Sequence, residues 1–241
     1  MKQRGAINTT LNYLNRTLKH AGPFIEEWNQ VPQLNTDVAV DANLDWEAFG
    51  TNFASLTSAT HSTGGGIKML TAGADNDQVI LLPHEDTQQS ALNTIDFQTD
   101  DEPYIGTRIA TESDVTTMLI HFGLDLTPKT LNETTDADQA FFSFDTDNSD
   151  TTWMANWSVG GTDTEYNTGI AVSASTAYTL AISIDADRVA HFFINSKREA
   201  SSAALTSGVD FKPFLGIQAL ATAARTLYCR KIIVGKGVQT N

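Results

Sequence analysis

From about residue 36 onward, apolar and polar residues alternate along short segments of the chain. In residues 178–184, every second residue is large and apolar, and the residues between them are small or polar. A period of two predicts a strand with one buried face. Similar runs predict further strands at 67–70, 79–83, 92–97, 104–110, 115–122, 139–144, 152–159, 189–194, 211–217 and 226–234. Because turn residues separate these runs and no helical pattern interrupts them, the sequence predicts a sandwich or barrel of antiparallel strands.

The segment 178–198 predicts two consecutive hairpins. Asp185-Ala186-Asp187 separates the first two strands, and Asn195-Ser196 separates the second from the third. Asn tolerates the left-handed backbone conformation that such tight turns require. The two hairpins together predict a meander within one sheet.

Residues 1–35 have a different pattern. Leu11, Leu14 and Leu18 recur at the spacing of one helix face, which predicts a short amphipathic helix that starts near residue 8 and ends before Gly22-Pro23. Three leucines form too narrow an apolar stripe to hold a helix alone in water. We interpret residues 1–35 as an N-terminal anchoring arm, with a helical layer packed on the main domain as the alternative. Residues 36–241 are interpreted as the sandwich.

Composition indicates a folded domain. The 241 residues are 41% hydrophobic and 18% charged, and no apolar run approaches the roughly 18 residues that a membrane span requires. A single cysteine, Cys229, excludes an internal disulfide framework. Residues 1–5 lead into polar Asn8-Thr9-Thr10 rather than an apolar segment. We therefore expect no signal peptide, no membrane partner and synthesis in a cytoplasm.

Charge is unevenly distributed along the chain, and the formal net charge is −14. Residues 1–20 hold four basic residues and no acidic one, whereas residues 69–187 hold 21 acidic residues against two basic ones. The negative charge argues against nucleic acid as the main partner, because phosphate binding needs a basic surface. A solvated acidic surface explains most of this pattern. Docking of a basic arm onto an acidic neighbour is the alternative.

The run from Ala177 to Asn195 resembles the back-sheet meander of the concanavalin A-like superfamily, which includes laminin-G and lectin-like jelly rolls. Its apolar residues alternate up to Ile184, and Asp185, Asp187 and Phe193-Ile194-Asn195 follow. The Asn195-Ser196 turn departs from the usual Asn-Gly. This resemblance implies an all-β fold, an antiparallel jelly-roll β-sandwich.

A wider segment is similar to modules of tailed-bacteriophage virion proteins, including fibres and capsid decorations. The residues that carry this likeness are 136–142, Trp153, 160–164 and Thr168-Gly169, and the whole resemblance spans roughly residues 64–236. It implies a non-enzymatic virion structural protein, a capsid decoration or head-fibre protein attached through its arm. The alternative is a glycan-binding tail-fibre or spike module for host adhesion.

The resemblance also implies the partners and the location. The implied partners are other virion proteins, namely the capsid or sister subunits in a homo-oligomer such as a trimer, together with a host glycan. The implied location is the virion, after synthesis in the host cytoplasm. No cofactor is implied.

The sequence lacks the carboxylate spacing that is typical of jelly-roll glycosidases. Jelly-roll glycosidases carry two carboxylates on one strand face, commonly spaced Glu-x-Asp-x-x-Glu, because one donates a proton while the other attacks or activates water. The nearest sequence, Glu112-Ser113-Asp114, is followed by no second Glu at that spacing. We therefore expect no enzymatic activity and no catalytic, cofactor-binding or metal-binding residue, and a glycoside hydrolase or lyase is the third interpretation. If activity is found, Glu112, Asp114 and Glu165 are the first residues to examine.

Three further groups of residues were considered as ligands. Asp145, Asp147 and Asp150 are close enough for calcium but lack the Gly and the distal Glu of an EF-hand loop, so a solvated hairpin loop is favoured. Cys229 lies in an apolar segment and is interpreted as a buried, inert thiol. The histidines show no metal-ligand spacing and are interpreted as packed or surface residues; they are His20, His61, His84, His121 and His191.

Aromatic residues raise the question of a sugar-stacking face. Phe141, Trp153, Trp157 and Tyr166 are the candidates. Trp153, Ala155 and Trp157 share one strand face by alternation, and this face is interpreted as part of the core rather than as a ligand surface.

Overall fold

The computed structural model describes residues 46–53, 57–83, 96–127, 131 and 136–237, together with the backbone of 21–27 and 34–35. The predicted N-terminal helix and the first part of the predicted strand 92–97 lie outside these residues. Within them, no helix is long and apolar enough to cross a membrane.

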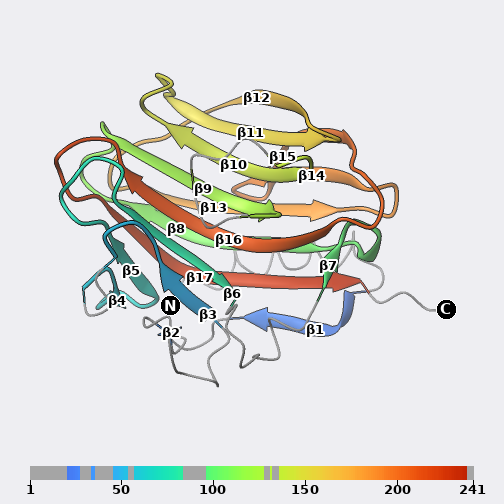
Figure 1. Ribbon diagram of the computed structural model, residues 1–241, viewed down its shortest axis with the longest axis horizontal. Helices are drawn as coiled ribbons and strands as arrows, with labels where there is room; N and C mark the ends of the chain where they lie inside the picture. The colour runs from blue at the N-terminus through green and yellow to red at the C-terminus, as the bar shows by residue number, and fades with distance from the viewer. Residues whose placement is uncertain are drawn as a thin grey trace.

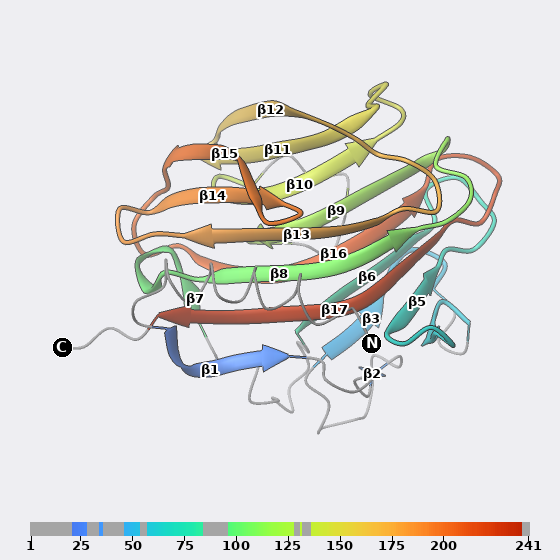
Figure 2. The same cartoon turned by 180° about the vertical axis from the view of Figure 1, so that it is seen from behind.

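Two sheets packed face to face form the molecule (Figures 1 and 2). We call them the front sheet and the back sheet. The front sheet is ordered β12 (Thr162–Ala171), β11 (Thr152–Val159), β10 (Gln139–Asp145), β9 (Met118–Asp125), β16 (Asp210–Ala219), β6 (Gln78–Pro83), β3 (Trp46–Phe49) and β2 (Leu34–Asn35), and β7 (Phe97–Gln98) pairs with β16. The back sheet is ordered β15 (Lys197–Ala204), β14 (Val189–Ile194), β13 (Ala177–Ile184), β8 (Tyr104–Thr111), β17 (Thr226–Gly237), β5 (Ile67–Leu70) and β4 (Ala59–His61), and β1 (Ala21–Glu27) pairs with β17.

The predicted fold class, an antiparallel jelly-roll sandwich, is confirmed. Among the described residues, every strand pairing is antiparallel except that of the two-residue β2 with β3. The predicted meander is the run β13-β14-β15, at the end of the back sheet. Its second turn uses Asn195 and Ser196 at φ values of 51° and 73°, and two successive left-handed residues are typical of the tight turn that joins right-twisted strands.

Aromatic side chains join the two sheets across the core. Trp153 of β11 meets Tyr178 of β13 edge to face, with ring centroids 5.5 Å apart. Phe142 of β10 meets Phe192 of β14 in the same way at 5.4 Å. Edge-to-face pairs add to the free energy gained from burying the rings. Trp153 is buried and Trp157 packs against the same cluster, so their shared face is core, as interpreted from the sequence.

One long strand was missed by the alternation pattern. The sequence of β12, from Thr162 to Ala171, is polar on both faces because this strand lies at the edge of the front sheet, and most of its residues are exposed. A strand without a buried face shows no alternation of apolar and polar residues, and the sequence pattern therefore cannot reveal it. The register of β12 is set by its hydrogen bonds to β11.

Part of the predicted arm lies in the back sheet. β1 pairs antiparallel with the end of β17, with Glu27 opposite Ile233. The boundary between residues 1–35 and 36–241 stays a prediction.

Glu112 and Asp114, the carboxylates singled out in the sequence, hold a buried arginine. Arg225 is 6% exposed, and its Nη1 lies 2.7 Å from Asp114 Oδ2 and 3.8 Å from Glu112 Oε1. Its Nε donates to the Thr117 carbonyl at 3.1 Å. Hydrogen bonds from the Thr116 hydroxyl and amide, together with Arg225, lower the pKa of Asp114 to about 2. This cluster ties the loop before β9 to the start of β17.

We predict that Arg225→Met destabilises the fold by about 1–3 kcal/mol, because Thr117 and the partly exposed Glu112 and Asp114 lose their hydrogen bonds and ion pairs to the buried guanidinium. Urea unfolding followed by circular dichroism measures the loss. Arg198→Met, at an exposed arginine of β15, is the control and should change stability by less than about 0.5 kcal/mol. Equal effects of the two substitutions would contradict a structural role for the cluster.

Candidate functional site

Strand register gathers outward-facing residues on the front sheet that are far apart in sequence. Three rows cross neighbouring strands. The first is Glu165, Asn156 and Phe141, the second Ser143, His121 and Gly216, and the third Asp145, Leu119 and Gln218. Because neighbours on a sheet face lie about 5 Å apart, these rows form one continuous surface.

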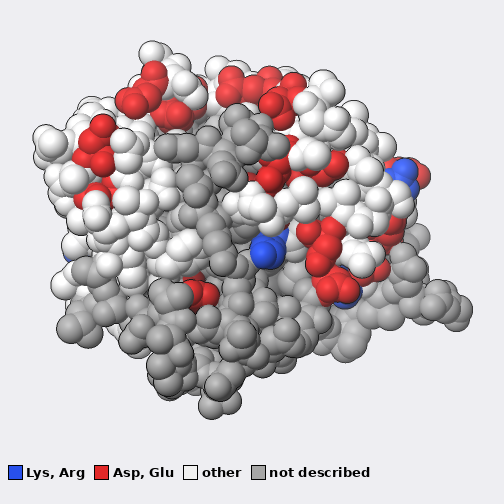
Figure 3. Space-filling view, viewed as in Figure 1, with Lys and Arg blue, Asp and Glu red and all other residues white. Residues whose placement is uncertain are grey.

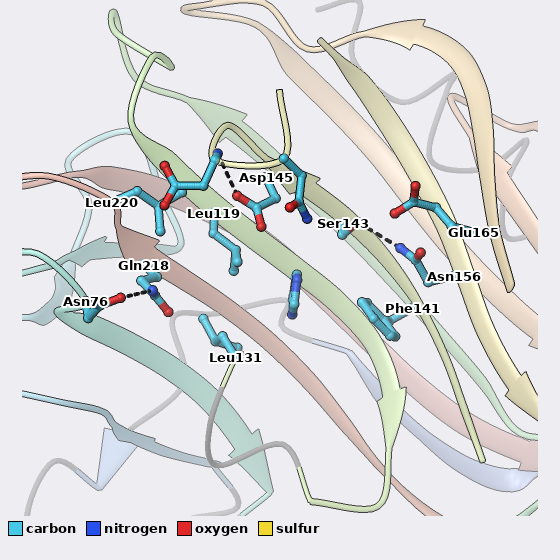
Figure 4. Close-up of a pocket in the computed structure, with 13 residues that line it drawn as sticks. Asn76, Leu119, Leu131, Phe141, Ser143, Asp145, Asn156, Glu165, Gln218 and Leu220 are labelled. Atoms are coloured by element: carbon cyan, nitrogen blue, oxygen red, sulfur yellow. Dashed lines mark hydrogen bonds between the residues drawn. The ribbon is translucent and has the colours of Figure 1, made fainter. Parts of the chain in front are cut away.

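A cavity of about 300 Å³ opens on this surface, and we call it the outer-face cavity. Figure 4 shows Asn156 and Glu165 at one end and Asn76 and Gln218 at the other. The second row ends at Gly216, whose missing side chain makes room for Leu131. A Cβ on Gly216 would clash with Leu131 Cδ2.

Side-chain hydrogen bonds hold the amides of the cavity in place. Asn156 Nδ2 donates to Ser143 Oγ at 2.8 Å. Gln218 Nε2 donates to Asn76 Oδ1 at 2.8 Å, and Gln78 Nε2 donates to Gln218 Oε1 at 2.6 Å. An amide fixed through one of its groups still has donors or acceptors for a ligand. The ends of the cavity are therefore preorganised polar walls.

Carboxylates line the same cavity without a basic side chain among its described lining residues. Asp145, Asp147 and Glu165 are the acids, and Figure 3 shows acidic side chains gathered over this face. Burial raises the pKa of Asp145. Burial and the negative charges of Glu165 and Asp145 raise the pKa of Asp150, although the Asp145 amide lowers it. The like charges are therefore close enough to repel one another.

His121 contributes to the cavity lining and is 7% exposed. Its ring centroid lies 4.8 Å from that of Phe141, which is itself 3% exposed. Burial lowers the pKa of His121 to about 3, so the imidazole is neutral at ordinary pH. A neutral imidazole offers one hydrogen-bond donor and one acceptor.

The other residues considered from the sequence lie in several places. Asp145, Asp147 and Asp150 border the turn between β10 and β11, the favoured hairpin loop, and the described residues hold no group of three His, Cys, Asp or Glu placed for a metal ion. Cys229 is buried, as interpreted from the sequence, and burial raises its pKa to about 12. Tyr166 is 47% exposed at the sandwich edge.

The five histidines also lie in different parts of the molecule or outside the described residues. His61 is exposed, and His191 Nε2 lies 2.8 Å from Asp185 Oδ2. His20 and His84 lie outside the described residues. His121 could not be identified as a site residue from the sequence, because the alternation of its strand does not tell which of the two faces meets the core.

Comparisons with known proteins give the fold. No protein-family model and no curated protein matches the sequence. A Shewanella oneidensis MR-1 protein of unknown function is similar in structure, with a TM-score of 0.58 and 11% identity over 100% of this chain and 98% of that one. A Bacillus licheniformis β-glucanase gives 0.53 and 9% over 91% and 96%. The carbohydrate recognition domain of Emp47p gives 0.56 and 12% over 91% and 98%. The chain therefore has the concanavalin A-like jelly-roll fold shared by lectins and glycan-cleaving enzymes.

The expectation that this protein has no enzymatic activity is contradicted by these comparisons. It rested on the missing carboxylate spacing of a hydrolase. The β-glucanase and an alginate lyase share the fold, so the architecture supports chemistry on glycans by more than one arrangement of residues. The absence of the Glu-x-Asp-x-x-Glu spacing from one strand therefore does not exclude catalysis.

A carboxyl pair with one buried member, Asp125, and one partly exposed member, Asp136, lies at the end of β9. Asp125 is 5% exposed, and burial together with Asp136 raises its pKa to about 9. Burial alone would raise the pKa of Asp136. Hydrogen bonds from Asp125 and Thr127 outweigh this effect, so the pKa of Asp136 is lowered. Asp125 is therefore protonated at neutral pH and donates to the Asp136 carboxylate. Thr127 also donates its amide to Asp136 Oδ2 at 2.7 Å.

We predict that the pair makes the fold less stable as pH rises from about 4 to about 9, because the folded state then binds one more proton than the unfolded state. Asp125→Asn keeps a donor to Asp136 without ionising. It should raise stability near neutral pH by at least about 1 kcal/mol and flatten the pH dependence. Thermal unfolding across this pH range measures both effects. Asp187→Asn in an exposed turn is the control, and a profile of Asp125→Asn identical to that of the parent protein would refute the pair.

Proposed function

We propose that the protein binds a glycan in the outer-face cavity of the front sheet. The observation that carries this proposal is the convergence of fixed amides, carboxylates and a neutral imidazole from six strands or their flanking loops on one cavity of about 300 Å³. That volume is at the lower end of small-ligand sites, about 300–1,000 Å³. Sugar hydroxyls both donate and accept hydrogen bonds, so they match such a mixed polar surface. The shared fold with a carbohydrate recognition domain and a β-glucanase supports the same class of ligand.

Leucines complement the polar walls. Leu119, Leu131 and Leu220 line the cavity beside the polar groups. The C–H faces of a sugar ring are apolar, so they can pack on aliphatic side chains while the hydroxyls meet the amides. This arrangement favours a pyranose ring over a fully polar ligand.

The location in a bacteriophage particle, attachment through residues 1–35 and the trimeric state stay predictions. The sequence resemblance to virion modules supports them. In that setting, a glycan site on the front sheet corresponds to the alternative stated above, a host-adhesion module of a tail fibre or spike.

Calorimetric titration with a panel of oligosaccharides tests the proposal. Asn156→Ala should weaken binding of the best oligosaccharide about tenfold, because one or two hydrogen bonds worth about 0.5–1.5 kcal/mol each are lost. Thr179→Ala, on β13 of the back sheet, is the matched control and should bind like the parent protein. The release of reducing ends or unsaturated products is measured in the same samples. A panel without any binding, or equal weakening by both substitutions, would refute the proposed site.

A further inference from the structure

We propose that the outer-face cavity selects a glycan with free amino groups, such as a glucosamine oligomer, and rejects a polyuronate. This inference rests on the proposed function and adds the charge class of the ligand. It stands on two independent features of the cavity, its one-sided charge and its unpartnered buried histidine.

The cavity carries negative charge, because its described lining residues include three acidic side chains and no lysine or arginine. Asp145, Asp147 and Glu165 line it, and Asp150 lies within electrostatic reach of Asp145 and Glu165. On the same face, Lys212 lies six residues from the lining residue Gln218 along β16, or about 20 Å along the strand. A ligand carboxylate would therefore meet repulsion in the cavity, whereas an ammonium group would relieve the repulsion among the acids.

Hydrogen bonds made by the acids leave acceptors free. Asp145 Oδ1 accepts the Asp147 amide at 2.9 Å, and the Asp145 amide donates to Asp150 Oδ2 at 2.9 Å. A carboxylate has about four lone-pair sites, so the backbone hydrogen bonds from Asp147 and Asn148 do not saturate Asp145. An ammonium group supplies three donors, and charge-assisted hydrogen bonds of this kind are the stronger class.

The second feature is His121, which makes no hydrogen bond to the described residues. The side chain is more than nine-tenths buried and lines the cavity. Its ring nitrogens are not among the fully buried polar atoms of the described residues that lack a partner, so they are accessible from the cavity. A ligand hydroxyl or amine in the cavity can therefore form a hydrogen bond with the imidazole. Because burial keeps His121 neutral, it adds no positive charge that would favour a uronate.

A metal ion is a poorer occupant for the same acids. Within the described residues, no three His, Cys, Asp or Glu groups converge as metal ligands, and divalent cations require several oxygen ligands at short distance. An ammonium group needs only hydrogen-bond distances from separate acceptors. The geometry thus favours an organic cation spread over the cavity.

The test compares three oligomers of equal length by calorimetric titration at low ionic strength. They are a β-linked glucosamine oligomer, its fully N-acetylated form and a uronate oligomer. The parent protein should bind the amino form at least about tenfold more tightly than the acetylated form, because two or more ion pairs are added. It should bind the uronate undetectably, and the preference for the amino form should shrink with added salt.

The double substitution Asp145→Asn, Glu165→Gln should remove the preference, so that the amino and acetylated oligomers bind with the same affinity to within about threefold. Asp187→Asn, in an exposed turn of the back sheet, is the charge-matched control and should keep the preference. His121→Leu should weaken the amino and acetylated forms by the same factor, since a neutral hydrogen-bonding group does not discriminate between them.

The outcomes separate this inference from the proposed function. Equal binding of the amino and acetylated forms, or tightest binding of the uronate, would overturn the charge inference while leaving a glycan site. Binding of none of the three oligomers, together with no binding in the wider panel, would overturn the proposed function itself. A preference that survives the double substitution would place the amino-group contact elsewhere.

Discussion

Packing of apolar side chains between the two sheets determines where every functional group on the front sheet lies. Alternate residues of β9, β10, β11 and β16 fill the core, as Phe122, Phe142, Trp153 and Leu215 do. A strand cannot shift by one residue without exposing these groups. The other set of alternate residues is thereby fixed on the outer face, free to vary for binding. The rigidity of the core is the reason that side chains more than 90 residues apart, such as Leu119 and Gln218, keep a fixed relation.

The acidic residues of the chain have different roles, depending on where the fold places them. Part of the negative charge supports the fold, as Glu112 and Asp114 do around Arg225. Another part is neutralised, since Asp125 keeps its proton beside Asp136. The acids of the outer-face cavity have neither a basic partner among the described lining residues nor full burial. Net charge alone therefore describes solubility, whereas the placement of individual carboxylates describes recognition.

Much of the fold could be predicted from the sequence, and the reasons are local. The meander β13-β14-β15 has a clear period of two and turn residues suited to left-handed conformations, at Asn195 above all. The edge strand β12 could not be found this way, because its residues have no buried face. The site was harder still. His121, Ser143 and Gly216 become neighbours only through register, and no local pattern tells which face of a strand points outward or which strand lies beside it.

The most direct test of the central claim is a nuclear magnetic resonance titration of the isotope-labelled protein with its best-binding oligosaccharide. The account predicts that backbone amide shifts concentrate on the front sheet, at His121, Phe141 and Asn156, with little change along β13 and β14. Shifts confined to the back sheet, or to the sandwich edge around Tyr166 and Arg198, would contradict a glycan site in the outer-face cavity.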